Sequence, residues 1–320
     1  MSNAIEPKPK ICILAGPTAV GKTDLSLMLA RNLYGEIISA DSAQVYKYMD
    51  VGTAKLKPSE MQGIKHYMLD EVYPSDDFSV AEFKTRAEGY IKDMNNRGKL
   101  PVITGGTGLY INSLLNNLDF TESISDEAFR KEMQELAGSR GSEYVHSLLE
   151  KVDPAAFRKL HPNDLRRVIR ALEVYRHTGK PISYFQEESR KIPPRYDYAY
   201  VAFTMDREKL YKRIEQRVDL MLRDGLIEEV EKLLSMGYDK NLTSMQALGY
   251  KEIVGYLEGK CSKEEAISII KRDTRHYAKR QLTWFRRDSR IFWINVDNYY
   301  NREILLENII RYIAGKIPLV

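Results

Sequence analysis

Cysteine and long apolar runs are both scarce in this 320-residue sequence. The two cysteines, Cys12 and Cys261, have no metal-ligand spacing, and so low a count fits a reducing compartment. No apolar run approaches the roughly 20 residues that a membrane-spanning helix requires. The opening residues, MSNAIEPKPK, lack the apolar stretch of a secretory signal. We therefore expect a cytoplasmic protein that does not bind membranes.

Histidine is also sparse, and its placement argues against a metal site. The five histidines have no i,i+4 partner and no cysteine neighbour, so we interpret them, His66 included, as structural or surface residues. Apolar residues make up 43% of the chain and charged residues 29%, as in ordinary soluble enzymes. The length suits one large domain or two modest ones.

Short apolar runs separated by helical patterns predict a parallel α/β sheet flanked by helices. The five expected strands are Lys10–Ala15, Glu36–Ala40, Leu100–Thr104, Tyr198–Thr204 and Arg290–Val296. The stretch Asp126–Gly179 is helix-rich without a strand, and the prolines after Ile192 mark its exit. We therefore expect a core of residues 1–118 and 195–320, interrupted by an all-helical insertion domain of residues 119–194.

The first expected strand runs directly into a phosphate-binding loop of the pattern G-x-x-x-x-G-K-[ST]. Its glycines let backbone N–H groups turn onto an anion at the start of the next helix. The lysine adds a positive charge, and the threonine hydroxyl can ligate Mg²⁺. A diphosphate or triphosphate is the expected ligand of Gly16, Pro17, Thr18, Ala19, Val20, Gly21, Lys22 and Thr23.

Carboxylates are few at the ends of the other central strands, whereas a kinase or nucleotide hydrolase usually places one there to organise its metal. Asp41 closes the second expected strand, and the third runs into the glycines of Gly105–Gly108. A single carboxylate suits proton removal from a nucleophile as well as metal support. A capping role for Asp41, and an ordinary strand-to-helix turn for Gly105–Gly108, remain open alternatives.

Eight segments in order resemble the tRNA dimethylallyltransferases, and the similarity runs through almost the whole chain. The segments are GPTAVGKT (Gly16–Thr23), DSAQVYK (Asp41–Lys47), GTAK (Gly52–Lys55), GGTGLYI (Gly105–Ile111), RRVIRALEV (Arg166–Val174), RVDLMLRDGLIEEV (Arg217–Val230), QALGYKE (Gln246–Glu252) and KRQLTWFR (Lys279–Arg286). The bacterial form of the family is the expected match. The resemblance implies a P-loop NTPase-like core with a helical insertion, whose loop holds a prenyl diphosphate in place of a nucleotide.

The resemblance also implies the chemistry: transfer of a dimethylallyl group from dimethylallyl diphosphate to N6 of the adenosine 3′ of the tRNA anticodon. Asp41 would take a proton from N6 or orient it. Thr23, Lys22 and the loop amides would hold the diphosphate with Mg²⁺, and Arg217 would neutralise its growing charge. The residues alone favour a solvent-facing helix charge for Arg217, because its neighbours are so highly charged.

The segment Lys271–Arg290 carries eight Lys/Arg residues against two Asp and reads as a basic helix suited to RNA phosphates. An exposed charged helix without a partner is the alternative. A second basic cluster lies in the insertion, and two clusters suggest a clamp on the anticodon stem-loop. The expected tRNA contacts, from charge and resemblance together, are Asp41, Ser42, Ala43, Gln44, Thr107, Arg130, Arg166, Arg167, Arg170, Gln246, Gly249, Tyr250, Lys251, Lys279, Arg280, Gln281, Trp284 and Arg286.

Two other functions remain open. An adenylate isopentenyltransferase would share the fold but act on a free mononucleotide, which needs no basic helix such as Lys279–Arg286. A P-loop NTPase that binds or remodels RNA without modifying it would consume ATP. We expect the protein to be a monomer.

Overall fold

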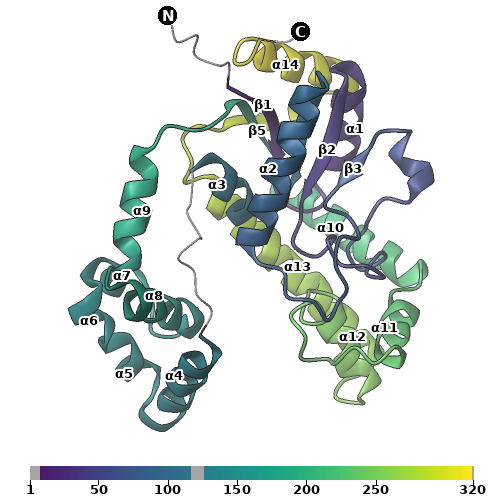
Figure 1. Ribbon diagram of the computed structural model, residues 1–320. Helices are drawn as coiled ribbons and strands as arrows, with labels where there is room; N and C mark the ends of the chain where they lie inside the picture. The colour runs from purple at the N-terminus through teal and green to yellow at the C-terminus, as the bar shows by residue number, and fades with distance from the viewer. Residues whose placement is uncertain (1–7, 117–125, 319–320) are drawn as a thin grey trace, which may run out of the picture. The chain divides into compact units, whose positions relative to one another are not determined.

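The computed structural model describes residues 8–116 and 126–318. Its core is a parallel sheet in the order β3-β2-β4-β1-β5-β6, which confirms the expected α/β fold (Figure 1). The strands are β1 (Lys10–Ala15), β2 (Gly35–Ala40), β3 (His66–Tyr67), β4 (Leu100–Gly105), β5 (Asp197–Thr204) and β6 (Phe292–Asn295). The sequence pattern missed β3, because two residues are too few to show a period. The last strand is shorter than expected, since a 3-10 turn begins at Val296.

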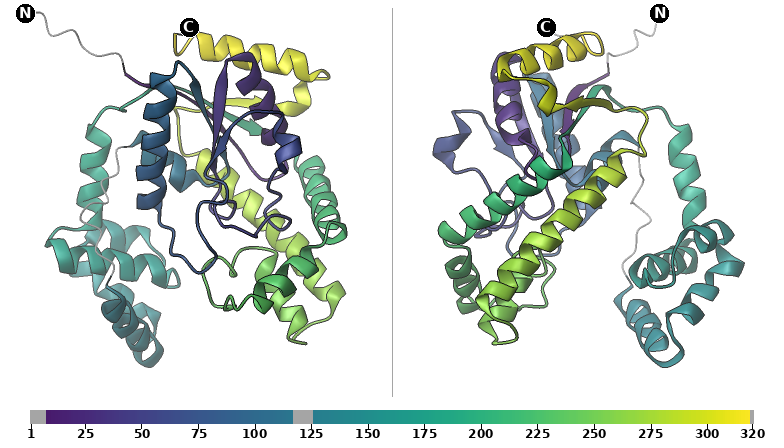
Figure 2. Two further views of the ribbon diagram at one scale, coloured as in Figure 1. Left: turned by 45° about the vertical axis from the view of Figure 1, so that its right-hand side comes forward. Right: turned by 180° about the vertical axis from the view of Figure 1, so that it is seen from behind.

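The strands are apolar along their whole length because helices cover both faces of the sheet. Along β1, Cys12 and Leu14 join the core formed with α1 and α14, and the alternation of a strand turns Ile11 and Ile13 to the opposite face. Figure 2 shows α1 and α2 on opposite sides of the sheet. The helices of this unit are α1 (Lys22–Asn32), α2 (Val80–Asn96), α3 (Gly108–Leu115), α10 (Arg207–Arg223), α11 (Leu226–Ser235), α12 (Tyr250–Leu257), α13 (Lys263–Phe285) and α14 (Arg302–Ala314), with 3-10 turns at Pro58–Met61 and Val296–Asn298.

The register of the central strands brings three loops together at one edge. Ala15 of β1 and Ala40 of β2 both lie opposite Gly105 of β4. The phosphate-loop motif, Asp41 and the Gly105–Gly108 segment therefore all leave the sheet at the same level. In parallel α/β sheets, ligands bind in the crevice outside the carboxyl ends of such strands.

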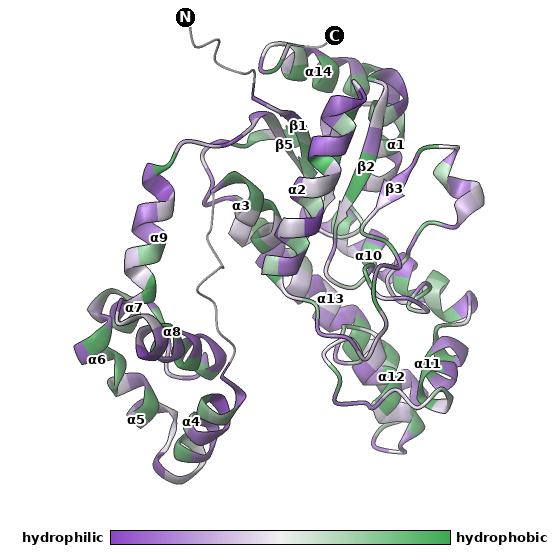
Figure 3. Ribbon diagram, viewed as in Figure 1, coloured by the Kyte–Doolittle hydropathy of each residue, from purple (hydrophilic) through white to green (hydrophobic). Residues whose placement is uncertain are grey.

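A second apolar cluster lies below this edge, where α10–α13 pack against the segment that follows Asp41. Val45, Met49, Leu226 and Tyr250 are among its buried members. Figure 3 shows both polar and apolar segments on these helices, as expected for helices with one buried face. The cluster fixes the loops beside the site to the helices behind them.

Residues 113–194 form a separate compact unit with its own core, which includes Phe129, Met133 and Leu149. Its helices are α4 (Glu127–Arg140), α5 (Ser142–Ser147), α6 (Leu149–Val152), α7 (Pro154–Lys159), α8 (Leu165–Thr178) and α9 (Ile182–Lys191). The structure divides the chain after Asn112 and after Pro194. The expected first boundary, between residues 118 and 119, lies outside the described residues. No helix in the described parts of the chain has the length and apolar character needed to cross a membrane.

Candidate active site

The lysine of the phosphate-loop motif, Lys22, binds backbone carbonyl oxygens of the same loop. Lys22 begins α1, and its Nζ donates hydrogen bonds to the carbonyl oxygens of Gly16 at 2.9 Å and Pro17 at 2.7 Å. Burial, and then the nearby charge of Arg217, lower the pKa of Lys22 to about 7, while Asp41 opposes the shift. Among the described residues Lys22 has no carboxylate partner. A half-buried cation whose hydrogen bonds go to carbonyl oxygens gains most from an anion at this loop.

Arg217 of α10 faces the same cavity. Its Nη2 makes one long hydrogen bond of 3.4 Å to the Thr53 carbonyl, and it has no ion pair within residues 8–116 and 126–318. Burial lowers its pKa, and the charge of Asp41 partly offsets that effect. The solvent-facing alternative for Arg217 is therefore wrong. Lys22 and Arg217, which pair with no carboxylate in the described part of the chain, therefore share one cavity with Asp41.

Asp41 lies where β2 ends, and its Oδ1 accepts a hydrogen bond from the Ala43 N–H at 3.0 Å. The neighbouring Ser42 N–H donates to the Thr107 hydroxyl at 3.2 Å, which ties the loop after β2 to the loop after β4. Gln44 is held within the protein, accepting from the Ser39 hydroxyl at 2.8 Å and donating to the Thr53 carbonyl at 3.2 Å. Asp41 therefore caps its own turn and still lines the cavity.

Helix α13 passes directly behind the phosphate-loop motif, and Gln281 joins the two. Its Oε1 accepts from the Thr18 N–H at 2.9 Å, and its Nε2 donates to the Gly106 carbonyl at 3.1 Å. A Cβ at Gly106 would overlap the Gln281 amide, and one at Gly108 would overlap the Trp284 indole. Because they lack a Cβ, these two glycines let the Gln281 and Trp284 side chains of α13 pack against the loop. They therefore do more than form an ordinary strand-to-helix turn.

Two adjoining cavities lie at this edge of the sheet. The first is polar and contains Lys22, Thr23, Asp41 and Arg217. The second has an apolar wall from α10, α11 and α13, formed by Ile214, Val218, Met221, Leu226 and Ile270. Both are lined by Thr18, Asp41, Arg217 and Tyr277. An anion site and an apolar site therefore meet at one carboxylate.

Comparison with known proteins decides the family. The model of the IPP transferase family matches residues 44–288. A tRNA dimethylallyltransferase of Acetivibrio thermocellus is 55% identical over 95% of this chain and 97% of its own length. One from Carboxydothermus hydrogenoformans is 56% identical over 89% and 92%. This chain belongs to the IPP transferase family.

Comparison with solved structures supports the same family assignment. The tRNA isopentenylpyrophosphate transferase of Bacillus halodurans superposes with a TM-score of 0.73 at 43% identity, covering 97% of each chain. A eukaryotic dimethylallyltransferase that acts on tRNA gives a TM-score of 0.77 at 33% identity, covering 89% of this chain and 73% of its own. The predicted family and its P-loop-like core with a helical insertion are thus confirmed.

Two of the residues expected to contact tRNA are buried in the structure. Tyr250 is fully buried, and its hydroxyl donates to Glu229 at 2.6 Å. Gln281 is 6% exposed and uses both ends of its amide inside the protein. Neither side chain lies on the outer surface, and each lines one of the two cavities, so their contact with tRNA stays a prediction. Trp284 is half-buried, and its indole packs against Gly108.

The basic helix α13 has two different halves. Its earlier cations are paired: Lys271 with Asp219 at 2.6 Å, Arg272 with Asp273 at 2.8 Å and Arg275 with Glu215 at 2.5 Å. At its later end Lys279, Arg280 and Arg286 are exposed, with no ion pair in the described part of the chain. The unpaired charges thus gather where the family motif KRQLTWFR lies.

The basic cluster of the insertion is largely paired. Arg130 contacts Glu173 and Glu127 at 2.8 Å each, and Arg170 also pairs with Glu173. Arg167 pairs with Asp164 at 3.1 Å. Arg166 is exposed and has no ion pair among the described residues. Elsewhere, Gln246 donates to the Lys240 carbonyl, Lys251 lies 3.5 Å from Glu252, and Gly249 precedes α12.

Two residues of the site carried no clear signal in the sequence. His66, interpreted above as a structural or surface residue, lines the polar cavity, and its Nδ1 lies 2.8 Å from the Ile64 carbonyl. Tyr277 lines both cavities, and burial and the charge of Asp41 raise its pKa to about 12. Tyr277 stands seven residues before Trp284, and that helical spacing was the one available hint.

Proposed function

We propose that this chain transfers the dimethylallyl group of dimethylallyl diphosphate to N6 of the adenosine 3′ of the anticodon in tRNA. The observation that carries the proposal is the site itself: Lys22 and Arg217, which have no carboxylate partner among the described residues, lie beside Asp41 and an apolar cavity. The family relatives named tRNA dimethylallyltransferase support the substrate assignment.

The diphosphate binds in the polar cavity, held by Lys22, the Thr23 hydroxyl and the backbone N–H groups of the loop. The allylic carbon lies where the two cavities meet, because Thr18, Asp41, Arg217 and Tyr277 line both. The apolar wall excludes water, which would otherwise compete with the amine for that carbon.

In the reaction the carbon–oxygen bond to diphosphate breaks, and its electron pair leaves on the diphosphate oxygen. The N6 lone pair forms the new carbon–nitrogen bond, and the N6 proton passes to Asp41. Arg217 neutralises the charge that grows on the leaving group, where a preorganised guanidinium is most effective. An adenine amine is a weak nucleophile, so alignment contributes more than proton removal.

The residues present fit Mg²⁺. Thr23 and Asp41 offer a hydroxyl and a carboxylate at one cavity, and no group of three or more His, Cys, Asp or Glu suited to a metal occurs in the described ranges. Mg²⁺ is commonly bound by one or two protein oxygens together with substrate phosphate. When bound, it would supply further charge neutralisation to the diphosphate.

The exposed cations at the end of α13 (Lys279, Arg280 and Arg286) and Arg166 of the insertion are the proposed phosphate contacts to tRNA. The target base must leave its stack to reach Asp41, and an unpaired anticodon-loop base is the least costly to extrude.

Incubation with unmodified tRNA and dimethylallyl diphosphate, followed by nucleoside mass analysis, tests the proposal. We expect an adenosine heavier by one C5H8 unit and release of one diphosphate. Prenylated free adenine mononucleotide with unmodified tRNA would indicate an adenylate isopentenyltransferase instead. ATP consumption without prenyl transfer would indicate an RNA-dependent NTPase.

A further inference from the structure

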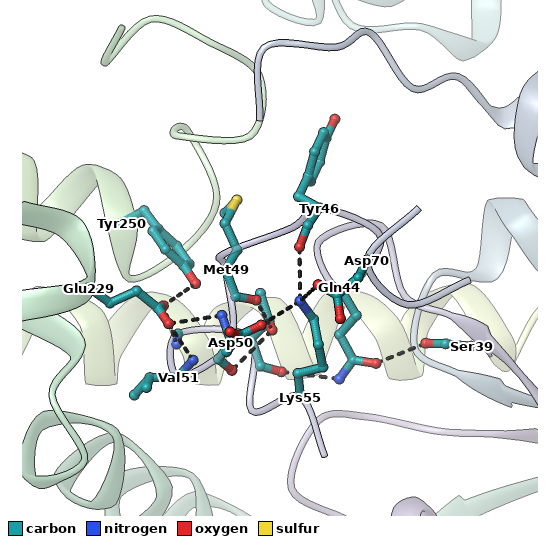
Figure 4. A network of polar contacts seen from close by, with 12 residues as sticks. Ser39, Gln44, Tyr46, Met49, Asp50, Val51, Lys55, Asp70, Glu229 and Tyr250 are labelled. Carbon is teal, nitrogen blue, oxygen red and sulfur yellow. Dashed lines mark hydrogen bonds and ion pairs between the residues drawn. The ribbon is translucent and has the colours of Figure 1, made fainter. Parts of the chain in front are cut away.

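One carboxylate on α11, that of Glu229, holds a turn in the segment after Asp41 (Figure 4). Its Oε2 accepts hydrogen bonds from the backbone N–H groups of Asp50 at 2.9 Å and Val51 at 2.7 Å. Its Oε1 accepts the Gly52 N–H at 3.0 Å and the Tyr250 hydroxyl at 2.6 Å. Four donors therefore converge on a single side chain.

The turn, residues 50–53, packs closely against Tyr250 at Gly52. A Cβ at Gly52 would lie 2.5 Å from a ring carbon of Tyr250. Lys55 anchors the far side, donating to the Tyr46 carbonyl at 2.9 Å and pairing with Asp50 and Asp70 at 2.7 Å each. Figure 4 shows Glu229 and Lys55 reaching the turn from different sides.

The turn ends at the carbonyl that contacts the active-site arginine. The Thr53 oxygen accepts hydrogen bonds from Arg217 Nη2 at 3.4 Å and from Gln44 Nε2 at 3.2 Å. Arg217 has no ion pair among the described residues, and this carbonyl is its hydrogen-bond partner there. A neutral carbonyl can orient a guanidinium without neutralising it, which leaves the charge for a ligand.

We propose that Glu229 is a positioning residue, which holds Arg217 toward the diphosphate through the turn of residues 50–53. Glu229 lines neither cavity, so it acts through the three backbone N–H groups and the Tyr250 hydroxyl that it binds. The inference rests on the proposed diphosphate site. It assigns the family segments GTAK and RVDLMLRDGLIEEV to one device, because Glu229 of the second binds Gly52 of the first.

A double-mutant cycle between Glu229→Gln and Arg217→Lys tests the coupling. The glutamine replaces one acceptor oxygen with a donor that faces N–H or O–H groups, so the turn loosens. The lysine keeps the charge of Arg217 but loses its planar fork. The measurements are the Kd for inorganic diphosphate, by calorimetry, and kcat and KM for dimethylallyl diphosphate.

We expect Arg217→Lys to weaken diphosphate binding about 10-fold or more in the wild-type background. In the Glu229→Gln background the same change should cost less than about 3-fold, because Arg217 is already misplaced there. Glu229→Gln alone should lower kcat/KM for dimethylallyl diphosphate while the Kd for tRNA stays unchanged.

Glu36→Gln is the matched control for a general loss of stability. Glu36 is a buried carboxylate near the start of β2, away from the site edge, and binds Arg97 and the Tyr67 hydroxyl. In the Glu36→Gln background Arg217→Lys should keep its full cost. Tyr250→Phe removes one of the four donors to Glu229, so it should give a smaller coupling of the same sign and serves if Glu229→Gln does not fold.

Additive effects of Glu229→Gln and Arg217→Lys on diphosphate binding would overturn the inference, as would equal coupling with Glu36→Gln. The cycle on inorganic diphosphate needs no turnover, so it decides the inference even if no prenyl transfer occurs. Absence of transfer with intact coupling would instead refute the proposed function.

Discussion

The arginines of the insertion and the cations at the sheet edge resemble each other in sequence but differ in their partners. Arg130 and Arg170 share Glu173, a carboxylate whose side chain is fully buried, so their charges are neutralised within the fold. Lys22 and Arg217 contact carbonyl oxygens and have no carboxylate partner in the described residues. The difference indicates which cations hold the protein together and which are available to a ligand.

The same distinction divides α13. Its earlier cations are bound to acids on the same helix or on α10, and its later ones point into solvent. A paired charge has to break its ion pair before it can bind phosphate, whereas an unpaired one releases only small counterions. We therefore expect the unpaired cations of α13 to contact the ligand, even where the paired ones are as densely spaced.

The largest expected effect is at Asp41. Asp41→Asn keeps the oxygen that caps the Ala43 N–H but removes the base, so turnover should fall roughly 10²- to 10⁴-fold while the protein stays folded. Steady-state kinetics with saturating Mg²⁺ measures it. Asp164→Asn, which breaks an ion pair in the insertion, should leave turnover within about 2-fold. Near-normal turnover in Asp41→Asn would falsify the proposed role.

Arg217→Ala and Thr23→Ala come next. Each removes a contact to the leaving group, so kcat/KM for dimethylallyl diphosphate should fall about 10²- to 10³-fold, mainly through kcat. The Kd for tRNA should stay unchanged. Arg167→Ala, a paired arginine of the insertion, is the matched control and should change the diphosphate response by less than about 2-fold. Lost tRNA binding with a normal diphosphate response would reverse the assignment.

Salt dependence tests the two halves of α13. Replacing Lys279, Arg280 and Arg286 with alanine should make the log–log salt slope of tRNA binding shallower by up to about 2 to 3 units. Replacing the paired Lys271, Arg272 and Arg275 removes the same formal charge and should change the slope by less than about 1 unit. Equal slopes in the two triple variants would remove the distinction between paired and unpaired cations.

The smallest expected effect is the uptake of a proton by Lys22 when diphosphate binds. Lys22, whose pKa is about 7 in the free protein, is largely neutral at about pH 8, and a bound diphosphate raises that pKa. Binding should therefore take up to about one more proton in the wild type than in Lys22→Arg, which is always charged. Calorimetry of diphosphate binding in buffers of different ionisation enthalpy measures this. Identical proton uptake by the two proteins would show that Lys22 is already charged.

Local patterns were sufficient for the parts of the fold and site that depend on neighbours in sequence. The strand and loop from Lys10 to Thr23 are visible because apolar run, glycines and lysine are contiguous. The partners of Arg275 and Lys271 are not visible in the sequence, since Glu215 and Asp219 lie on another helix. Nor does the motif QALGYKE reveal that its tyrosine is buried, because burial is set by the packing of α11 and α12.

The central claim is that Lys22 and Arg217, which have no carboxylate partner among the described residues, bind a prenyl diphosphate. Competition binding tests it most directly: dimethylallyl diphosphate, inorganic diphosphate and ATP are titrated against the wild type and Arg217→Ala, without tRNA. We expect dimethylallyl diphosphate to bind most tightly, because it alone fills the polar and apolar cavities together, and to lose affinity with Arg217→Ala. Tighter binding of ATP, accompanied by its hydrolysis, would contradict the account.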